Sequence, residues 1–275
     1  MNTCVAHLPV RLNYWLAAAA AACSVGWSWP AYGAVELVPA GILTVGVEYA
    51  PPAFVGGAKV RTPEGIDALL VDDIGRRLSA KAQMTLFSPA NPTQSLQDGK
   101  ARVVLTPVTE TQAASASSRV IATGYSTGAM AIMRSDTDIK QWKQLQGRTV
   151  CLAEGGRYVG TLAEKYGAIE MVFKAPADSL LALRIGECDA AVHDSSMLNE
   201  LIKLPEWKKF SARLPVQDLK PLAFVVASND AELAEYLKQA AKAWANSHHL
   251  EKVTKAAVRD IAFEVYLDQT VTDCH

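Results

Sequence analysis

Residues 174–196, KAPADSLLALRIGECDAAVHDSS, repeat the plan of residues 88–109, SPANPTQSLQDGKARVVLTPVT. Each segment reads as a strand end, a Pro-Ala pair, a helix, a glycine turn, an apolar strand and a polar end. The proline and the glycine are ten residues apart in both segments. One unit used twice along a chain predicts two similar α/β lobes rather than one sheet.

The chain around these two units also alternates between strands and helices. Residues 42–50 are apolar and β-branched, which predicts a strand, and residues 65–82 carry apolar side chains at helical spacing. Further strands are predicted at 101–108, 148–156 and 169–177, and a long amphipathic helix at 230–247. This alternation predicts an α/β fold with parallel strands.

Four of the predicted strands end in polar or aromatic residues. In parallel α/β sheets, ligands bind at the carboxyl ends of the strands, because loops and helix N-termini converge there. We therefore expect a ligand-binding cleft between the two lobes. The candidate residues at these strand ends are Glu48, Tyr49, Pro107, Thr109, Gly155, Gly156, Arg157 and Asp194.

Composition excludes several classes of function. The chain has 275 residues, is 50% hydrophobic and carries a formal net charge of −1. This length suffices for one large domain or two small ones. The near-zero charge argues against nucleic-acid binding, which needs a basic surface. No cysteine or histidine spacing typical of a zinc site is present, so we expect no metal and no cofactor.

The first 33 residues have the composition of a secretory signal peptide. A start without acidic residues is followed by an apolar, alanine-rich stretch and by small residues before Ala34. We therefore expect export with cleavage before Ala34. A membrane anchor is one alternative, and a lipoprotein modified at Cys23 is another. Beyond the cleavage site no apolar run of 18 residues follows, which predicts a soluble mature protein.

Three cysteines remain after cleavage: Cys151, Cys188 and Cys274. In an oxidising compartment this odd number predicts one pair and one free thiol. The repeated plan makes the strands of Cys151 and Cys188 neighbours, so we predict a disulfide between them. Adjacent parallel strands do not offer ideal disulfide geometry, and two buried thiols are the alternative.

Six segments resemble those of a known family. The chain is similar, from about Gly41 to Leu267, to the periplasmic solute-binding proteins of the polar amino-acid class, which include the histidine- and glutamine-binding proteins of ABC importers. The segments that carry the resemblance are GILTVGVEYAPPAF (41–54), EGIDALLVDDIGRRL (64–78), LQDGKARVVLTPVTET (96–111), LQGRTVCLAEGGRYV (145–159), GECDAAVHD (186–194) and FEVYLD (263–268).

The resemblance implies a two-lobe periplasmic-binding-protein type II fold in which the chain crosses between the lobes twice, near 126–127 and near 220–221. Lobe one would comprise 34–125 plus 223–275, and lobe two 128–222. Such a protein is a monomer that binds one small solute and delivers it to the permease of an ABC transporter.

The resemblance also implies a role for Asp194, as the partner of the ligand's α-ammonium group. The physical argument agrees, because a carboxylate in a closing cleft is costly to desolvate unless a cation pairs with it. An alternative role for Asp194 is the N-cap of the next helix. Tyr49 would form an aromatic wall and Glu48 would meet a polar ligand group, whereas Asp67 is expected to be a structural acid that stabilises a helix start.

One departure from the family concerns the ligand's carboxylate. Relatives carry an arginine after the threonine that matches Thr109, whereas this chain has an alanine, Ala114, at or near that position. A hydroxyl does not replace a bidentate arginine. Three interpretations stay open: Arg157 and the Gly155 and Gly156 backbone supply the counter-charge, the ligand is an amine or amide without a carboxylate, or tight binding has been lost. Arg119 is a fourth candidate for the counter-charge, but we expect it to be a surface charge.

Two other functions remain as alternatives. One is an exported sensor or interaction protein of the same fold. The other is an enzyme resembling the cyclohexadienyl dehydratases, which would still need the missing anion clamp. The sequence has no G-x-S-x-G nucleophile motif, so we expect a binding protein and not an enzyme.

Overall fold

The computed structural model describes residues 37–38, 41–51, 56, 59–88, 91–109 and 117–269. The chain divides into the units 1–35 and 36–275, and all described residues belong to the second unit. The predicted signal peptide, Ala114 and Cys274 lie outside the described residues.

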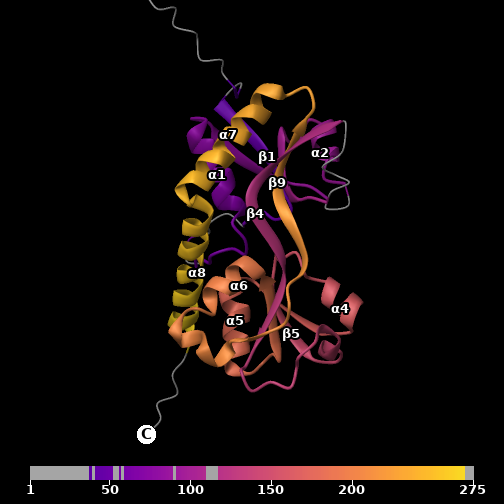
Figure 1. Cartoon of the computed structure of the whole chain (residues 1–275), viewed down its shortest axis with the longest axis vertical. Helices are drawn as coiled ribbons and strands as arrows, with labels where there is room; N and C mark the ends of the chain where they lie inside the picture. Colours follow the sequence, from indigo (N-terminus) through magenta and orange to yellow (C-terminus); the bar gives the residue numbers. More distant parts are fainter. Residues whose placement is uncertain are drawn as a thin grey trace, which may run out of the picture. The chain divides into compact units, whose positions relative to one another are not determined.

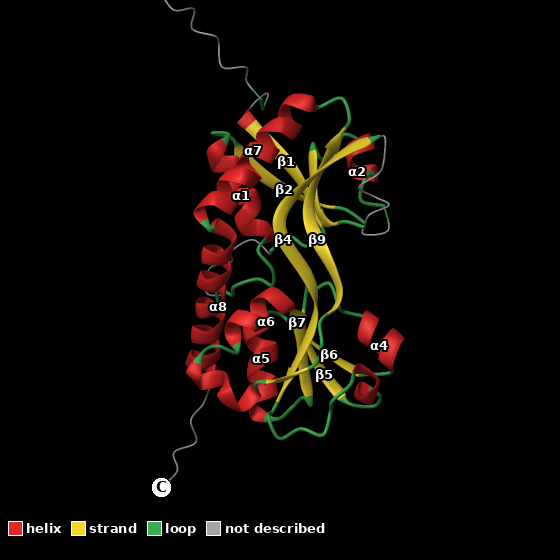
Figure 2. Ribbon diagram, viewed as in Figure 1, coloured by secondary structure: helices red, strands yellow, loops and turns green. Residues whose placement is uncertain are grey.

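The described residues form a mixed α/β fold (Figures 1 and 2). The strands are β1 (Ile42–Val47), β2 (Lys81–Leu86), β3 (Val103–Pro107), β4 (Ser118–Met133), β5 (Thr149–Ala153), β6 (Ile169–Phe173), β7 (Ala190–Asp194), β8 (Ala212–Arg213) and β9 (Gln217–Ala227). The α-helices are α1 (Asp67–Arg77), α2 (Gln94–Gln97), α4 (Thr161–Tyr166), α5 (Pro176–Ile185), α6 (Ser195–Leu201), α7 (Ala231–Ser247) and α8 (His249–Asp268), and the 3-10 helices are η2 (Trp142–Leu145) and η3 (Pro205–Phe210).

The repeated plan in the sequence corresponds to two parallel units of the same topology. In one unit β1 pairs with β2 and β3, and in the other β5 pairs with β6 and β7, all in parallel. The complete strand order is β2-β1-β3-β9-β4-β7-β5-β6, with β8 added to β4. The units β2-β1-β3 and β6-β5-β7 therefore flank a central antiparallel pair, β9 and β4.

The central pair differs from the expectation of two separate sheets. The predicted crossing points, 126–127 and 220–221, lie inside β4 and β9 and face each other, since Ser126 pairs with Pro221 and Thr127 with Lys220. Because both crossing segments are themselves strands, hydrogen bonding continues through them and joins all nine strands in one sheet. The ladder is irregular at the crossing, with register shifts on both sides of Ser126–Thr127.

The hydrophobic core follows the two parallel units. One cluster joins β1, β3 and β9 to α1 and α7, and its largest fully buried side chains include Phe224 and Trp244. Another joins β5 and β7 to α5 and α6, and it includes the fully buried Trp207. Figure 1 shows α1 and α7 beside one end of the long pair β4 and β9, and α5 and α6 beside the other.

The last helix, α8, belongs to the second of these clusters. The buried apolar side chains that lie against α5 and α6 are Val258, Ile261, Ala262 and Val265. The boundary predicted at residue 223 would group α8 with β1 to β3. Most of the packing of α8 is with α5 and α6, while Leu250 and Val253 near its start lie against the first cluster.

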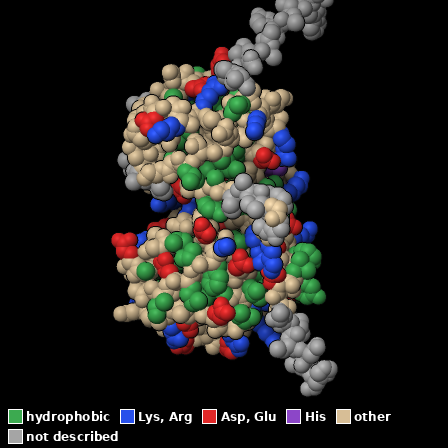
Figure 3. All heavy atoms as spheres, turned by 180° about the vertical axis from the view of Figure 1, so that it is seen from behind, with side chains coloured by type: hydrophobic (Ala, Val, Ile, Leu, Met, Phe, Trp, Pro, Cys, Tyr) green, Lys and Arg blue, Asp and Glu red, His purple; other side chains and the backbone are tan. Residues whose placement is uncertain are grey.

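Two observations on the described residues concern membranes and nucleic acids. None of the helices described there combines the length and the apolar character that crossing a bilayer requires. On the face drawn in Figure 3, acidic and basic side chains are interspersed. This distribution agrees with the net charge of −1 and differs from the basic surface of nucleic-acid-binding proteins.

The predicted disulfide between Cys151 and Cys188 is confirmed, with the two Cα atoms 5.8 Å apart. Cys151 lies in β5, where its parallel partner on β7 is Ala191, and Cys188 lies in the turn before β7. The bond therefore joins a strand to the turn that precedes its neighbour. This placement avoids the unfavourable geometry of two cysteines within one parallel ladder.

We predict that replacing both cysteines (Cys151→Ser with Cys188→Ser) lowers the free energy of unfolding by about 2–4 kcal/mol, because the unfolded chain gains freedom when the loop is no longer closed. Urea denaturation of the oxidised proteins measures this difference. The double variant should not respond to dithiothreitol, whereas the wild type should lose a similar amount of stability on reduction. Equal unfolding midpoints for the oxidised wild type and the double variant would contradict the prediction.

Candidate functional site

The carboxyl ends of β1, β5 and β7 meet at Arg157. Arg157 follows β5 through the turn Gly155-Gly156, and its guanidinium faces three carboxylates. Its Nε donates to Glu48 Oε2 at 3.0 Å, its Nη2 donates to Asp67, and its Nη1 lies 3.7 Å from Asp194 Oδ2. We call Glu48, Asp67 and Asp194 the acidic cage.

The cage is largely shielded from water. The side chains of Arg157, Glu48 and Asp67 are 13–17% exposed, and that of Asp194 is 1% exposed. Burial acts to lower the pKa of Arg157, but the charges of Asp67, Asp194 and Glu48 outweigh it and raise the pKa above its ordinary value. Arg157 is therefore a permanent cation at the centre of the cage.

Asp194 is held by two hydroxyl groups on its inner side. Thr127 Oγ1 and the Tyr158 hydroxyl both donate to Oδ1, and they lie 3.1 Å from each other. The other oxygen, Oδ2, is buried and accepts no hydrogen bond from the described residues. Although Asp194 occupies the N-cap position of α6, its side chain makes no capping hydrogen bond. The capping alternative therefore does not account for this carboxylate.

Glu64 fixes the end of β7 from the loop before α1. Its Oε1 accepts from the Asp194 backbone N–H at 3.1 Å, and its Oε2 lies 2.9 Å from His193 Nδ1. The second ring nitrogen of His193 lies 2.6 Å from Ser179 Oγ. This serine, histidine and glutamate form a chain of the kind that activates nucleophiles, but Ser179 and His193 are fully buried. This buried chain ties β7 to α5 and to the loop before α1.

The turn Gly155-Gly156 leaves no room for side chains. Gly155 has a φ of +76°, and a Cβ there would lie 2.3 Å from the ring of Tyr49. A Cβ on Gly156 would lie 2.8 Å from Glu64 Oε2 and 2.9 Å from the Ala153 carbonyl oxygen. Tyr49 therefore covers the backbone of Gly155, and the loop that carries Arg157 is clamped.

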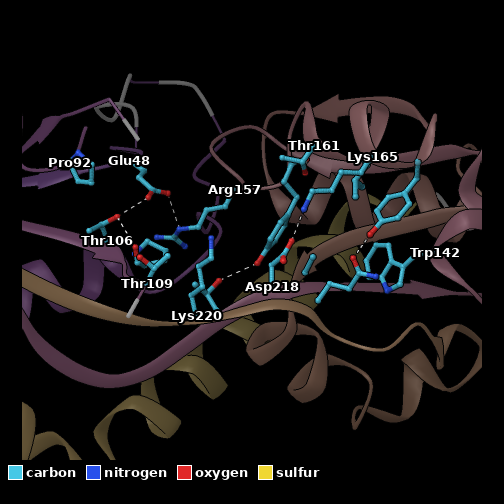
Figure 4. A pocket seen from close by; sticks show the side chains of 17 residues that line it. Glu48, Pro92, Thr106, Thr109, Trp142, Arg157, Thr161, Lys165, Asp218 and Lys220 are labelled. Atoms are coloured by element: carbon cyan, nitrogen blue, oxygen red, sulfur yellow. Dashed lines mark hydrogen bonds and ion pairs between the residues drawn. The ribbon is translucent and has the colours of Figure 1, made fainter. Parts of the chain in front are cut away.

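Two cavities adjoin the cage. The larger, of about 320 Å³, is lined by Pro107, Thr109 and Lys220 together with Glu48 and Arg157. The smaller, of about 20 Å³, also adjoins Glu48 and Arg157 and has room for about one water-sized group. Figure 4 shows the side chains that line the larger cavity, with Glu48 and Arg157 pointing toward each other.

The predicted residues thus fall into two sets. Glu48 and Asp194 belong to the cage, Arg157 lies at its centre, Tyr49, Gly155 and Gly156 lie next to it, and Pro107 and Thr109 line the larger cavity. Their role in ligand binding stays a prediction. Arg157 was expected as a counter-charge for a ligand's carboxylate, but in this structure it pairs with the carboxylates of the protein itself.

Sequence reasoning missed four residues of the site: Glu64, Asp67, Thr127 and Tyr158. Asp67 is the first residue of α1, as expected for an acid that stabilises a helix start, yet its carboxylate accepts from Arg157. Tyr158 follows Arg157 directly, and Thr127 lies at a predicted crossing point, so chain proximity was the only signal for either.

We predict that Gly155→Ala destabilises the protein more than Gly160→Ala. Both glycines have left-handed backbones, at φ +76° and +84°, so each substitution costs about 1–2 kcal/mol of backbone strain. At Gly160 no atom lies within 4 Å of an added Cβ, whereas at Gly155 the Tyr49 ring must move, which adds about 1–3 kcal/mol. Urea unfolding of both variants checks this difference, and equal losses would contradict the close contact with Tyr49.

We predict that Asp67→Asn stabilises the protein at neutral pH. Burial raises the pKa of Asp67, the charges of Asp194 and Glu48 raise it further, and the ion pair with Arg157 only partly opposes this. A carboxyl whose folded-state pKa is raised favours folding while protonated and loses that contribution as the pH rises through the folded pKa. The gain of the variant should therefore be present at pH 7.5 and smaller at pH 4.5.

Chemical denaturation at both pH values measures this gain. Asp136→Asn is the matched control, because Arg134 lowers the pKa of Asp136 at an exposed site. This control should show no gain at pH 7.5. A loss of stability in Asp67→Asn that is the same at both pH values would overturn the prediction.

The comparisons with known proteins agree with this architecture. The sequence profile of bacterial extracellular solute-binding proteins, family 3, matches residues 43–257. A search of curated protein sequences found no match. Among solved structures, a mutant of ArgBP from T. maritima has a TM-score of 0.52 at 21% identity, and the match covers 78% of this chain and 94% of that one.

Two further structures are similar over comparable lengths. An ancestral cationic amino acid solute binding protein has a TM-score of 0.54 at 19% identity, covering 79% of this chain and 96% of that one. AbpA from Streptococcus pneumoniae, an amino acid ABC transporter substrate-binding protein bound to L-arginine, has a TM-score of 0.53 at 17% identity, covering 80% and 96%. At these identities the likeness concerns the fold. Together with the match over residues 43–257, it means that the chain belongs to the bacterial extracellular solute-binding proteins, family 3.

Proposed function

We propose that this protein is a periplasmic solute-binding protein that captures a small amino-acid-like or amine solute and delivers it to the permease of an ABC importer. The observation that carries the proposal is the acidic cage. Three carboxylates from separate segments converge on one cation, Arg157, beside a cavity of about 320 Å³. Cavities of a few hundred cubic ångströms are typical of small-ligand sites.

The orphan oxygen of Asp194 supports a cationic group in the solute. Asp194 is 1% exposed, and its Oδ2 receives no hydrogen bond from the described residues. A buried acceptor without a donor costs about 1–3 kcal/mol, and more when it is charged. An ammonium group that donates to Oδ2 would remove this cost, so the site favours cationic or zwitterionic solutes. Thr109 and Lys220 line the larger cavity next to the cage and suit a carboxylate there.

A two-lobe arrangement would place this site between moving parts. The proposed lobes are the unit β2-β1-β3 with α1 and α7, and the unit β6-β5-β7 with α5 and α6. The separate core clusters and the irregular ladder between β4 and β9 support this division. Within this proposal 34–125 plus 223–275 and 128–222 remain the lobe boundaries, except that α8 joins the second lobe because most of its buried apolar side chains lie there.

The proposed location and partner rest on the family and on the N-terminal composition. Export through the signal peptide at 1–33 would deliver the mature protein, beginning at Ala34, to the periplasm as a monomer. The similar structures named above include one bound to L-arginine and one described as a cationic amino acid binder. Their ligands agree in charge with what the cage would accept here.

We predict that Asp194→Asn weakens binding of the solute by about two orders of magnitude or more, because removing one partner of a desolvated charge pair costs about 2–5 kcal/mol. A thermal-shift screen of amino acids, amines and amides identifies the solute, and calorimetry then measures its Kd. Asp136→Asn changes an exposed carboxylate outside the cage and should leave the Kd unchanged. Equal affinity of Asp194→Asn and the wild type would show that Asp194 is not the cation site.

A further inference from the structure

We propose that Arg157 is an internal occupant of the acidic cage: its guanidinium holds the position that a solute's cationic group takes, and the solute binds by displacing it. This inference rests on the proposed function and adds a competitor that belongs to the protein itself. It differs from the expectation that Arg157 only serves as a clamp for a carboxylate.

The guanidinium matches the cage in shape. A planar guanidinium presents five N–H donors in a fixed fork. Here Nε faces Glu48, Nη2 faces Asp67 and Nη1 faces Asp194. The three carboxylates come from the loop after β1, the start of α1 and the end of β7, so the cage forms only when these elements meet.

Arg157 does not donate a hydrogen bond to every buried carboxylate oxygen of the cage. Asp194 Oδ2 and Asp67 Oδ1 are buried and accept no hydrogen bond from the described residues. Both oxygens, and also Arg157 Nη1, lie 3.8 Å from the position that a Cβ on Gly65 would take. The two orphan oxygens therefore border the same small space beside the guanidinium. Three carboxylates share one cation there, so a free cation that donates to both oxygens can compete with Arg157.

The side chain of Arg157 can move while its backbone stays in place. Tyr49 covers Gly155 and Glu64 lies against Gly156, which holds the loop. Arg157 lines both the small cavity beside Asp67 and the larger cavity of about 320 Å³. Rotation of its long side chain would carry the guanidinium from the cage into the larger cavity. There it would meet the carboxylate of a zwitterionic solute whose cationic group has entered the cage.

In this exchange Arg157 also takes over the task of the carboxylate-binding arginine that relatives carry near the position of Ala114. Because the guanidinium of Arg157 fills the cage, only solutes that bind the cage better than this tethered cation are retained. Because Arg157 is covalently attached to the protein, its guanidinium competes for the cage at a high effective concentration. Weakly bound monovalent cations are thereby excluded.

The decisive test is rescue of Arg157→Ala by free guanidinium. Removing the side chain leaves a guanidinium-sized space among the three carboxylates. Guanidinium chloride at low millimolar concentrations, compared with equal sodium chloride, should raise the Tm of Arg157→Ala saturably, by about 3 °C or more at ten times its Kd. The wild-type Tm should not rise. Arg157→Gln, which keeps a polar side chain and perturbs folding less, should show the same response.

Two control variants distinguish this cage from other ion pairs. Arg148 also pairs with two carboxylates, Asp138 and Asp189, but at a more exposed position. Arg148→Ala should gain nothing from guanidinium, and adding Asp194→Asn to Arg157→Ala should abolish the rescue. The proposal is wrong if neither Arg157 variant responds to guanidinium, or if Arg148→Ala responds equally.

The solutes found in the thermal-shift screen provide an independent readout. Displacement predicts that carboxylate-free cations bind Arg157→Ala at least about tenfold more tightly than the wild type, because the competitor is gone. A purely structural role for Arg157 predicts equal or weaker binding, which would overturn the proposal. If no solute binds the wild type, the proposed function fails, while the guanidinium rescue still decides whether the cage accepts a cation.

Discussion

The antiparallel pairing of β4 with β9 is the constraint on which the rest of the structure depends. Both strands extend past one parallel unit into the other, and Thr127 pairs with Lys220 at the centre of the ladder. Thr127 donates to Asp194, and Lys220 lines the larger cavity. The same backbone ladder therefore joins the two units and presents side chains at the site. It also brings the strand ends of both units to one place, where Arg157 meets carboxylates from each.

Much of the fold could be predicted because it depends on local order along the chain. The repeated strand-helix-strand plan predicted the two parallel units and the neighbouring strands that Cys151 and Cys188 join. The length of β4 could not be predicted, since its sequence, SRVIATGYSTGAMAIM, contains glycine, serine and threonine and resembles a loop. The packing partners of α8 could not be predicted for a different reason. An amphipathic helix shows which face is buried, but not which element covers it.

The site could be predicted only as a set of strand ends. That rule found Glu48, Arg157 and Asp194, because it depends on topology alone. It could not show that Asp67 turns from the start of α1 toward Arg157, since sequence gives a charge without a direction. The sequence analysis also assigned Arg157 and Asp194 to opposite charges of one bound ligand. The structure brings the two together because buried carboxylates that lack another cation attract the nearest one the chain offers.

The disulfide fixes the backbone of part of the site and leaves other contacts of the site free to break. Cys151 and Cys188 lock β5 to the turn before β7, and these strands carry Arg157 and Asp194 at their ends. The backbone positions of these two residues therefore belong to one rigid block. The contacts of Arg157 with Glu48 and Asp67, and that of Glu64 with His193, instead join this block to the loop after β1 and to α1. Any separation of the two units breaks these three contacts and leaves the block intact. If the two units move as the proposed function requires, these three contacts would favour the arrangement described here, and a solute would shift the balance between arrangements only by the difference between its own contacts and those it replaces.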